Sequence, residues 1–101
     1  MSATVADTIL GQLGGNRFLA MTGAKNLMGL NNGLQFSLPA NLTRDKSNKM
    51  RITLLDDLYT VETYRLRNRG LDCRACSLRY GVYADQLRDV FTAITGLDTS
   101  L

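Results

Sequence analysis

The stretch MRITLLDDLYTVETYRLR, residues 50–67, decides the fold of this chain. In residues 50–54 apolar and polar side chains alternate, and this period of two places one face of a strand on a core and the other toward water. The pair Asp56-Asp57 then fits a hairpin turn, and residues 58–67 predict a second strand. The stretch therefore predicts two antiparallel strands joined by a tight turn.

Similar signals lie on both sides of this hairpin. Residues 34–38 alternate in the same way, and Asn31-Asn32-Gly33 before them is a strong turn signal. We expect residues 18–21 to form the strand that pairs with residues 34–38, despite the interruption at residues 22–26. Residues 39–49 are expected to form a polar, flexible, basic loop. After a turn at 68–70, a further strand is predicted over residues 71–80.

Two helices are predicted at the ends of the chain. An apolar stripe with a period of four predicts a helix from about Ala3 to Leu13, ended by Gly14-Gly15. Helical spacing of apolar residues predicts a second helix from about Tyr83 to Thr95, with Gly96 as its C-cap. The predicted fold class is α+β: an antiparallel sheet of four to five strands, with an N-terminal and a C-terminal helix packed on one face.

The length of 101 residues predicts a single α+β domain over residues 1–101. An apolar fraction of 45% is enough for a modest core, and a homodimer is left open because it would bury further apolar surface. No apolar run approaches the roughly 18–20 residues that span a bilayer, and residues 1–7 do not resemble a secretory signal. We therefore expect a cytoplasmic protein that does not act at a membrane.

The net charge of +3 is unevenly distributed along the chain. Residues 44–79 contain nine basic and five acidic residues, whereas residues 80–101 have a net charge of −2. Basic side chains can contact phosphates and an aromatic ring can stack on a base, so a sheet face with both could hold a nucleic-acid strand. The candidate nucleic-acid-binding residues are Arg44, Lys46, Lys49, Arg51, Tyr64, Arg65, Arg67, Arg69 and Arg74. The alternative is that these charges keep a small sheet soluble and protect its edges.

Strand alternation conflicts with one of these candidates. If Tyr59 and Val61 face the core, then Arg65 also faces inward, since side chains two apart share a face. Either a bulge or a strand that runs past the core would resolve the conflict.

Catalytic and metal chemistry is poorly supported by the sequence. The chain has no histidine, and Cys73-Arg74-Ala75-Cys76 supplies two of the four ligands of a tetrahedral zinc site. A redox pair would lie at a helix N-terminus, whereas this motif falls in a predicted strand, where at least one cysteine is expected to be buried. We therefore predict no enzyme activity, no metal and no cofactor.

Five stretches resemble a family of uncharacterised proteins of about this length from bacteriophages and bacterial mobile elements. They are FLAMTGAKN (18–26), LQFSLP (34–39), MRITL (50–54), DLYTVE (57–62) and FTAITGL (91–97). The resemblance implies a phage or prophage accessory protein and brings no catalytic or binding residues with it.

Three functions remain, in this order. The first is a non-enzymatic accessory protein that binds a protein partner, such as a host factor, through a sheet face or edge. The second is a nucleic-acid-binding module that uses the basic stretch 44–79, and the third is an enzyme.

Overall fold

The structure is a computed structural model, and it describes residues 5–39, 43–44, 46–67 and 71–97. The elements run in the order α1 (Val5–Leu13), α2 (Asn16–Thr22), β1 (Lys25–Leu30), β2 (Gly33–Ser37), β3 (Lys49–Leu55), β4 (Leu58–Arg67), β5 (Asp72–Val82), the short 3-10 helix η2 (Ala84–Gln86) and α3 (Leu87–Thr95).

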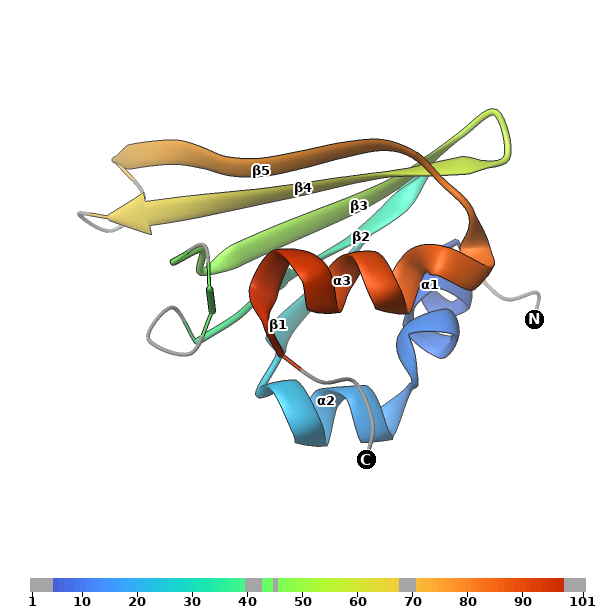
Figure 1. Cartoon of the computed structure of the whole chain (residues 1–101), viewed down its shortest axis with the longest axis horizontal. Helices are drawn as coiled ribbons and strands as arrows, with labels where there is room; N and C mark the ends of the chain where they lie inside the picture. Colours follow the sequence, from blue (N-terminus) through green and yellow to red (C-terminus); the bar gives the residue numbers. More distant parts are fainter. Residues whose placement is uncertain (1–4, 40–42, 45, 68–70, 98–101) are drawn as a thin grey trace.

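The five strands form one antiparallel sheet in chain order, β1-β2-β3-β4-β5. This is the meander that short turns between consecutive strands favour. The helices α1, α2 and α3 lie on one face of the sheet and leave the other face open (Figure 1). The predicted α+β fold is confirmed. We call the helix-covered face the inner face and the open one the outer face.

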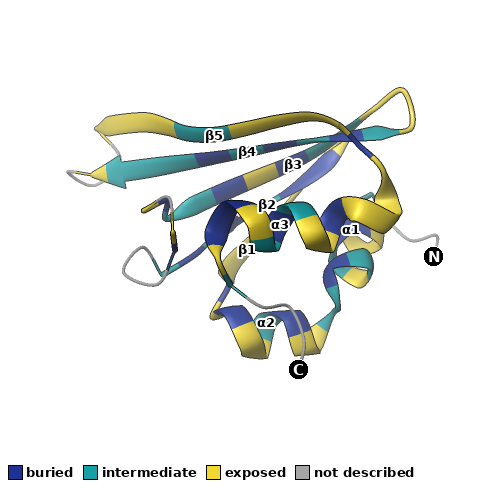
Figure 2. Ribbon diagram, viewed as in Figure 1, coloured by how far each residue is buried: buried dark blue, intermediate teal, exposed yellow. Residues whose placement is uncertain are grey.

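Alternation along the strands puts the apolar side chains on the inner face. Leu34, Ile52 and Val61 lie opposite one another on β2, β3 and β4, and all three are buried. Phe18 connects this layer to the helices, because its ring lies edge-on to Phe36 at 5.5 Å and to Phe91 at 5.1 Å between centroids. The core therefore lies between the inner face and the helices (Figure 2).

The expected strand at residues 18–21 is wrong, because these residues belong to helix α2. Gly15 precedes the helix with φ of 61°, and Gly23 ends it in the left-handed conformation. Within it, Phe18 and Thr22 are buried one turn apart, and the Thr22 hydroxyl donates to the Phe18 carbonyl at 2.7 Å. Four apolar residues in a row fit a buried helix turn as well as a strand.

The strand that pairs with β2 is instead β1. The turn at Asn31-Asn32 is confirmed, and Gly33 is the first residue of β2. A Cβ atom at Gly33 would lie 2.2 Å from the Ile52 carbonyl oxygen, so the close approach of β3 requires glycine there.

The other predicted elements are confirmed where they lie in the described residues. Helix α1 ends at Leu13 as predicted, and β5 covers most of the predicted last strand. The C-terminal helix begins with the 3-10 turn η2 and ends at Thr95, with Gly96 in the left-handed conformation. The predicted start of the first helix at Ala3 and the predicted turn at 68–70 lie outside the described residues.

Candidate nucleic-acid interface

Strands β4 and β5 extend past the helices at one end of the sheet (Figure 1). Along β4 the side chains of Tyr59, Val61 and Thr63 are buried on the inner face, and Arg65 follows them on the same face. Arg65 is only half-buried, because the strand has run beyond the core at this point. The conflict between alternation and an inward-facing arginine is therefore resolved by the length of the strand, and the bulges of this strand pair lie in β5.

The segment before β3 is held against this strand end. The Asn48 side chain donates from Nδ2 to the Leu66 carbonyl and accepts from the Leu66 amide, both at 2.8 Å. The backbone N–H of Asn48 donates to the Tyr64 carbonyl at 2.9 Å. These bonds place Lys46 beside β4, where its carbonyl accepts a hydrogen bond from Nη1 of Arg65 at 3.5 Å. Within the loop predicted over residues 39–49, the end that precedes β3 is thus hydrogen-bonded to the sheet through Asn48.

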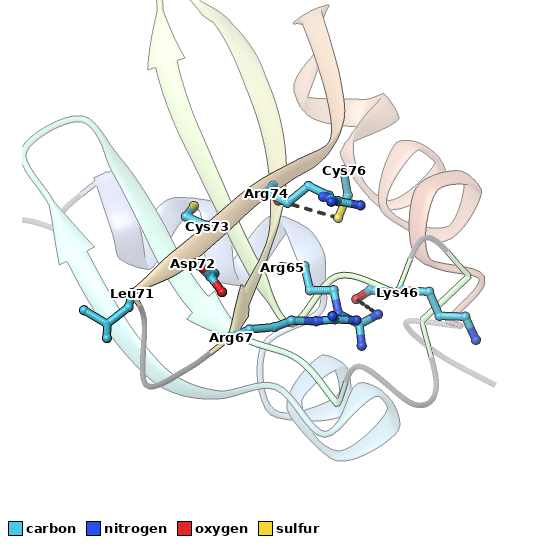
Figure 3. Close-up of a pocket in the computed structure, with 8 residues that line it drawn as sticks. All are labelled: Lys46, Arg65, Arg67, Leu71, Asp72, Cys73, Arg74 and Cys76. Atoms are coloured by element: carbon cyan, nitrogen blue, oxygen red, sulfur yellow. Dashed lines mark hydrogen bonds between the residues drawn. The ribbon is translucent and has the colours of Figure 1, made fainter.

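A hollow of about 760 Å³ lies at this end of the sheet (Figure 3). It is lined by Lys46, Arg65, Arg67, Leu71, Asp72, Cys73, Arg74 and Cys76, and we call it the basic hollow. Figure 3 shows Arg65 and Arg67 extending side by side toward the Lys46 segment, with Arg74 above them. Four cations from a loop and two strands therefore surround one space, and among the described residues of its lining Asp72 is the single carboxylate.

A second group of candidate residues lies on the outer face. Tyr64 lies opposite Lys49, and the Arg51 guanidinium lies over the Tyr64 ring, 5.7 Å from its centroid. Arg51 also donates from Nε to Gln35 at 3.1 Å, and the Tyr64 hydroxyl donates to the Glu62 carboxylate. The hydrogen bond to Glu62 and burial raise the pKa of Tyr64. A smaller hollow of about 260 Å³ adjoins this group.

The remaining two candidates join neither group. The Arg44 amide donates to the Thr95 carbonyl at 2.6 Å, and Arg44 Nη1 donates to the Ala93 carbonyl at 3.4 Å. Arg44 therefore satisfies carbonyl groups at the C-terminal end of α3, where a cation is also favoured by the helix dipole. Arg69 lies outside the described residues.

The nine candidates thus do not form the single arginine- and tyrosine-bearing face that the sequence suggests. The basic hollow contains Lys46, Arg65, Arg67 and Arg74, whereas Tyr64, Lys49 and Arg51 lie on the other side of the sheet. Strict alternation is the physical reason, because Tyr64 and Arg65 are neighbours in one strand and must project to opposite faces.

The two cysteines lie in β5, as predicted, and neither is in a disulfide bond. Cys73 is exposed and Cys76 is half-buried, so the expectation of a buried cysteine is wrong. The reason is that β5 is an edge strand whose first residues lie past the core. Within the described ranges, no group of three or more histidine, cysteine, aspartate or glutamate residues could hold a metal ion.

Sequence reasoning missed two residues of this region. Asp72 lies opposite Arg67 in the register of β4 and β5 and lines the hollow with the arginines, and Asn48 fastens the Lys46 segment. Asp72 lies within the strand predicted over residues 71–80 but was not singled out as a site residue, and no signal in the sequence identified Asn48 as the residue that joins loop and strand.

The fold and this region define an α+β protein with a basic surface hollow at one end of its sheet. Comparison with family models, curated proteins and solved structures finds no match for the chain. The resemblance to phage and mobile-element proteins therefore stays a prediction. No helix among the described residues has the length and apolar character needed to cross a membrane.

Proposed function

We propose that the protein binds nucleic acid through the basic hollow. The observation that carries this proposal is the convergence of Lys46, Arg65, Arg67 and Arg74 on one space of about 760 Å³. Cations gathered in this way attract a polyanion, and guanidinium groups match the geometry of phosphate oxygens. The protein would then act by binding and not by catalysis, as expected for a cytoplasmic accessory protein of a phage or mobile element.

The arrangement favours a phosphate backbone over a single small anion. The four cations come from the loop before β3 and from strands β4 and β5, so they are spread along the hollow and can contact successive phosphates of one strand. Among the described residues of the lining, Leu71 is the one large aliphatic side chain and is 87% exposed, so these residues give a base no apolar enclosure. Contacts to phosphates position a nucleic acid without reading its sequence. We therefore expect binding that depends strongly on salt and little on sequence.

Titration of labelled single- and double-stranded DNA and RNA, followed by fluorescence anisotropy, tests this proposal. If four phosphates of a single strand are contacted, the logarithm of the affinity falls with the logarithm of salt concentration with a slope of about −3. Replacing Arg67 by Ala removes one contact and reduces this slope by about 0.7. The matched control is Arg17→Ala, an equal charge change at an exposed position of α2.

Two outcomes would contradict binding of nucleic acid through the basic hollow. If no nucleic acid binds at low salt, or if Arg67→Ala and Arg17→Ala weaken binding equally, the hollow is not the binding site. Equal effects would mean that only the overall positive charge of the protein attracts the nucleic acid.

A second candidate function, binding of a protein partner such as a host factor, is favoured by apolar side chains near the β1 edge. Met21, Leu27 and Met28 are 36%, 40% and 55% exposed. An edge strand that carries exposed apolar side chains is a typical contact surface for another protein. If this surface binds a partner, the double substitution Leu27→Asp and Met28→Asp abolishes its capture and Arg17→Asp does not. A partner that both variants capture equally would bind elsewhere.

A further inference from the structure

Strand β5 forms the other edge of the sheet and pairs with β4 on one side only. It has 11 residues, and most of them are exposed (Figure 2). Two of its large side chains, Leu78 and Tyr80, are 43% and 76% exposed. A long edge strand of this kind offers a row of backbone donors and acceptors to another strand.

A bulge determines which strand can pair with this edge. Thr63 lies opposite Ser77 and Tyr64 lies opposite Ala75, so Cys76 is an extra residue in β5. An extra residue reverses the alternation of faces beyond it. As a result, Asp72 and Arg79 project to the same face, although seven positions separate them: they lie opposite Arg67 and Val61, which share the inner face of β4.

The reversal makes β5 a poor match for an ordinary strand. Residues opposite one another in an antiparallel pair project to the same face. A regular strand can satisfy this rule on one side of Cys76 and then violates it on the other. Between Asp72 and Arg79, only a strand with a compensating bulge keeps the faces matched, and a second copy of this chain has that bulge at Cys76. The other bulge of β5 lies between Arg79 and Val82, outside this stretch.

Charge selects the register between two such copies. Two registers match the faces on both sides of the bulge. One of them places Arg74 opposite Arg79 of the second copy, and like charges directly opposite are unfavourable. The other places Asp72 opposite Arg79 of the second copy and Arg74 opposite Ser77. By two-fold symmetry, this register forms the carboxylate–guanidinium pair twice.

We propose that β5 pairs with β5 of a second copy in this register, which joins the two sheets into one of ten strands. The same register places Cys73 opposite Leu78 of the second copy on the outer face, and Leu71 opposite Tyr80. The exposed apolar side chains of β5 are thereby covered. The two-fold axis is perpendicular to the sheet, so both basic hollows open on the same side. This proposal stands on the edge strand alone and does not depend on nucleic-acid binding.

Sedimentation of charge variants in the absence of nucleic acid tests the proposal. The wild-type protein is expected at twice the 11.2 kDa chain mass at high concentration. Arg79→Asp and Asp72→Arg each place like charges opposite one another, so each variant alone is expected to be monomeric. An equimolar mixture of the two restores both attractive pairs and is expected to return to the dimer mass. Arg17→Asp is the matched control and stays dimeric.

A cross-link provides a readout that does not depend on charge. Opposite residues of an antiparallel pair have Cα atoms about 4.5–5.5 Å apart, within the span of a disulfide. In Leu78→Cys the new thiol faces Cys73 of the second copy, and oxidation with diamide is expected to give a covalent dimer on a non-reducing gel. Adding Cys73→Ser removes this product.

Each of the following results would overturn the proposal. They are a wild-type monomer at every concentration, an Arg79→Asp variant that is still a dimer, and a cross-link that persists without Cys73. A mixture of the two charge variants that stays monomeric would also exclude this register.

Discussion

The Asn48 side chain joins the fold to the basic hollow, and its removal is the most informative single perturbation. Asn48→Ala removes two hydrogen bonds of 2.8 Å to the backbone of Leu66, and both are partly buried. A hydrogen bond of this kind contributes a net 0.5–1.5 kcal/mol, so the free energy of unfolding is expected to fall by about 1–3 kcal/mol. In a domain of this length each kcal/mol lowers Tm by about 4–8 °C.

Two measurements follow the effect of Asn48→Ala. Urea unfolding monitored by circular dichroism gives the change in stability, and hydrogen exchange gives its location, because the Leu66 amide loses its acceptor and exchanges faster. The segment with Lys46 then keeps the backbone hydrogen bonds at residue 48 but is held less firmly beside Arg65, so affinity for nucleic acid also falls. The matched control is Asn32→Ala, which removes one exposed hydrogen bond of 3.4 Å to the Leu54 carbonyl.

The reasoning is refuted if Asn48→Ala unfolds within about 0.5 kcal/mol of the wild type, the usual range of surface substitutions. Unchanged exchange of the Leu66 amide would lead to the same conclusion. An equal loss of stability in Asn32→Ala would show that the Asn48 bonds have no special role.

Three further predictions concern the core, a close contact and a titrating group. Phe18→Ala leaves a cavity between the sheet and the helices and lowers the free energy of unfolding by about 3–5 kcal/mol, measured by urea unfolding. Gly33→Ala forces a methyl group against the backbone of β3 and is expected to lower the free energy of unfolding by at least about 1–3 kcal/mol. Gly11→Ala in α1, where the added methyl group meets open space, is expected to raise it by about 0.5–1 kcal/mol in the same urea unfolding experiment. The pKa of Tyr64 is raised above 10.0 by Glu62, so the folded state keeps this proton longer than the unfolded state. The contribution of Tyr64 to the free energy of unfolding is present below pH 10 and is lost as the pH rises through the pKa of the folded state. Urea unfolding in alkaline buffers is therefore expected to show a smaller loss of stability with rising pH in Tyr64→Phe than in the wild type.

The strands that the sequence predicts well are those with one buried face. In β2, β3 and β4 the alternation is visible because every second side chain is in the core. Strand β1 was missed for the opposite reason: five of its six residues are exposed, so no burial pattern constrains their identity. An edge strand that is held by backbone hydrogen bonds alone has no alternation of apolar and polar residues by which the sequence could predict it.

The two glycines that flank α2 mark the ends of this helix. Gly15 and Gly23 both have positive φ and delimit a helix of seven residues, too short for its apolar period to be recognised. The tertiary contacts of Phe18 with Phe36 and Phe91 decide the conformation of this segment, and they join residues far apart in the sequence.

The candidate site was predicted in part. Lys46, Arg65, Arg67 and Arg74 come together as one basic group, as the charge distribution suggested. Their separation from Tyr64 follows from strand alternation and could have been predicted from the sequence. The core ends before Arg65 because of tertiary packing, and the bulge at Cys76 depends on the pairing of β5 with β4. Neither of these has a local signal in the sequence.

Nuclear magnetic resonance tests the central claim most directly, because it distinguishes the two faces of the sheet. A short single-stranded oligonucleotide is added to the ¹⁵N-labelled protein at low salt, and amide and arginine Nε–H shifts are followed. We expect the largest changes at Lys46, Arg65, Arg67 and Arg74. Changes concentrated instead at Arg51 and its neighbours on the outer face, or no changes at all, would contradict the account.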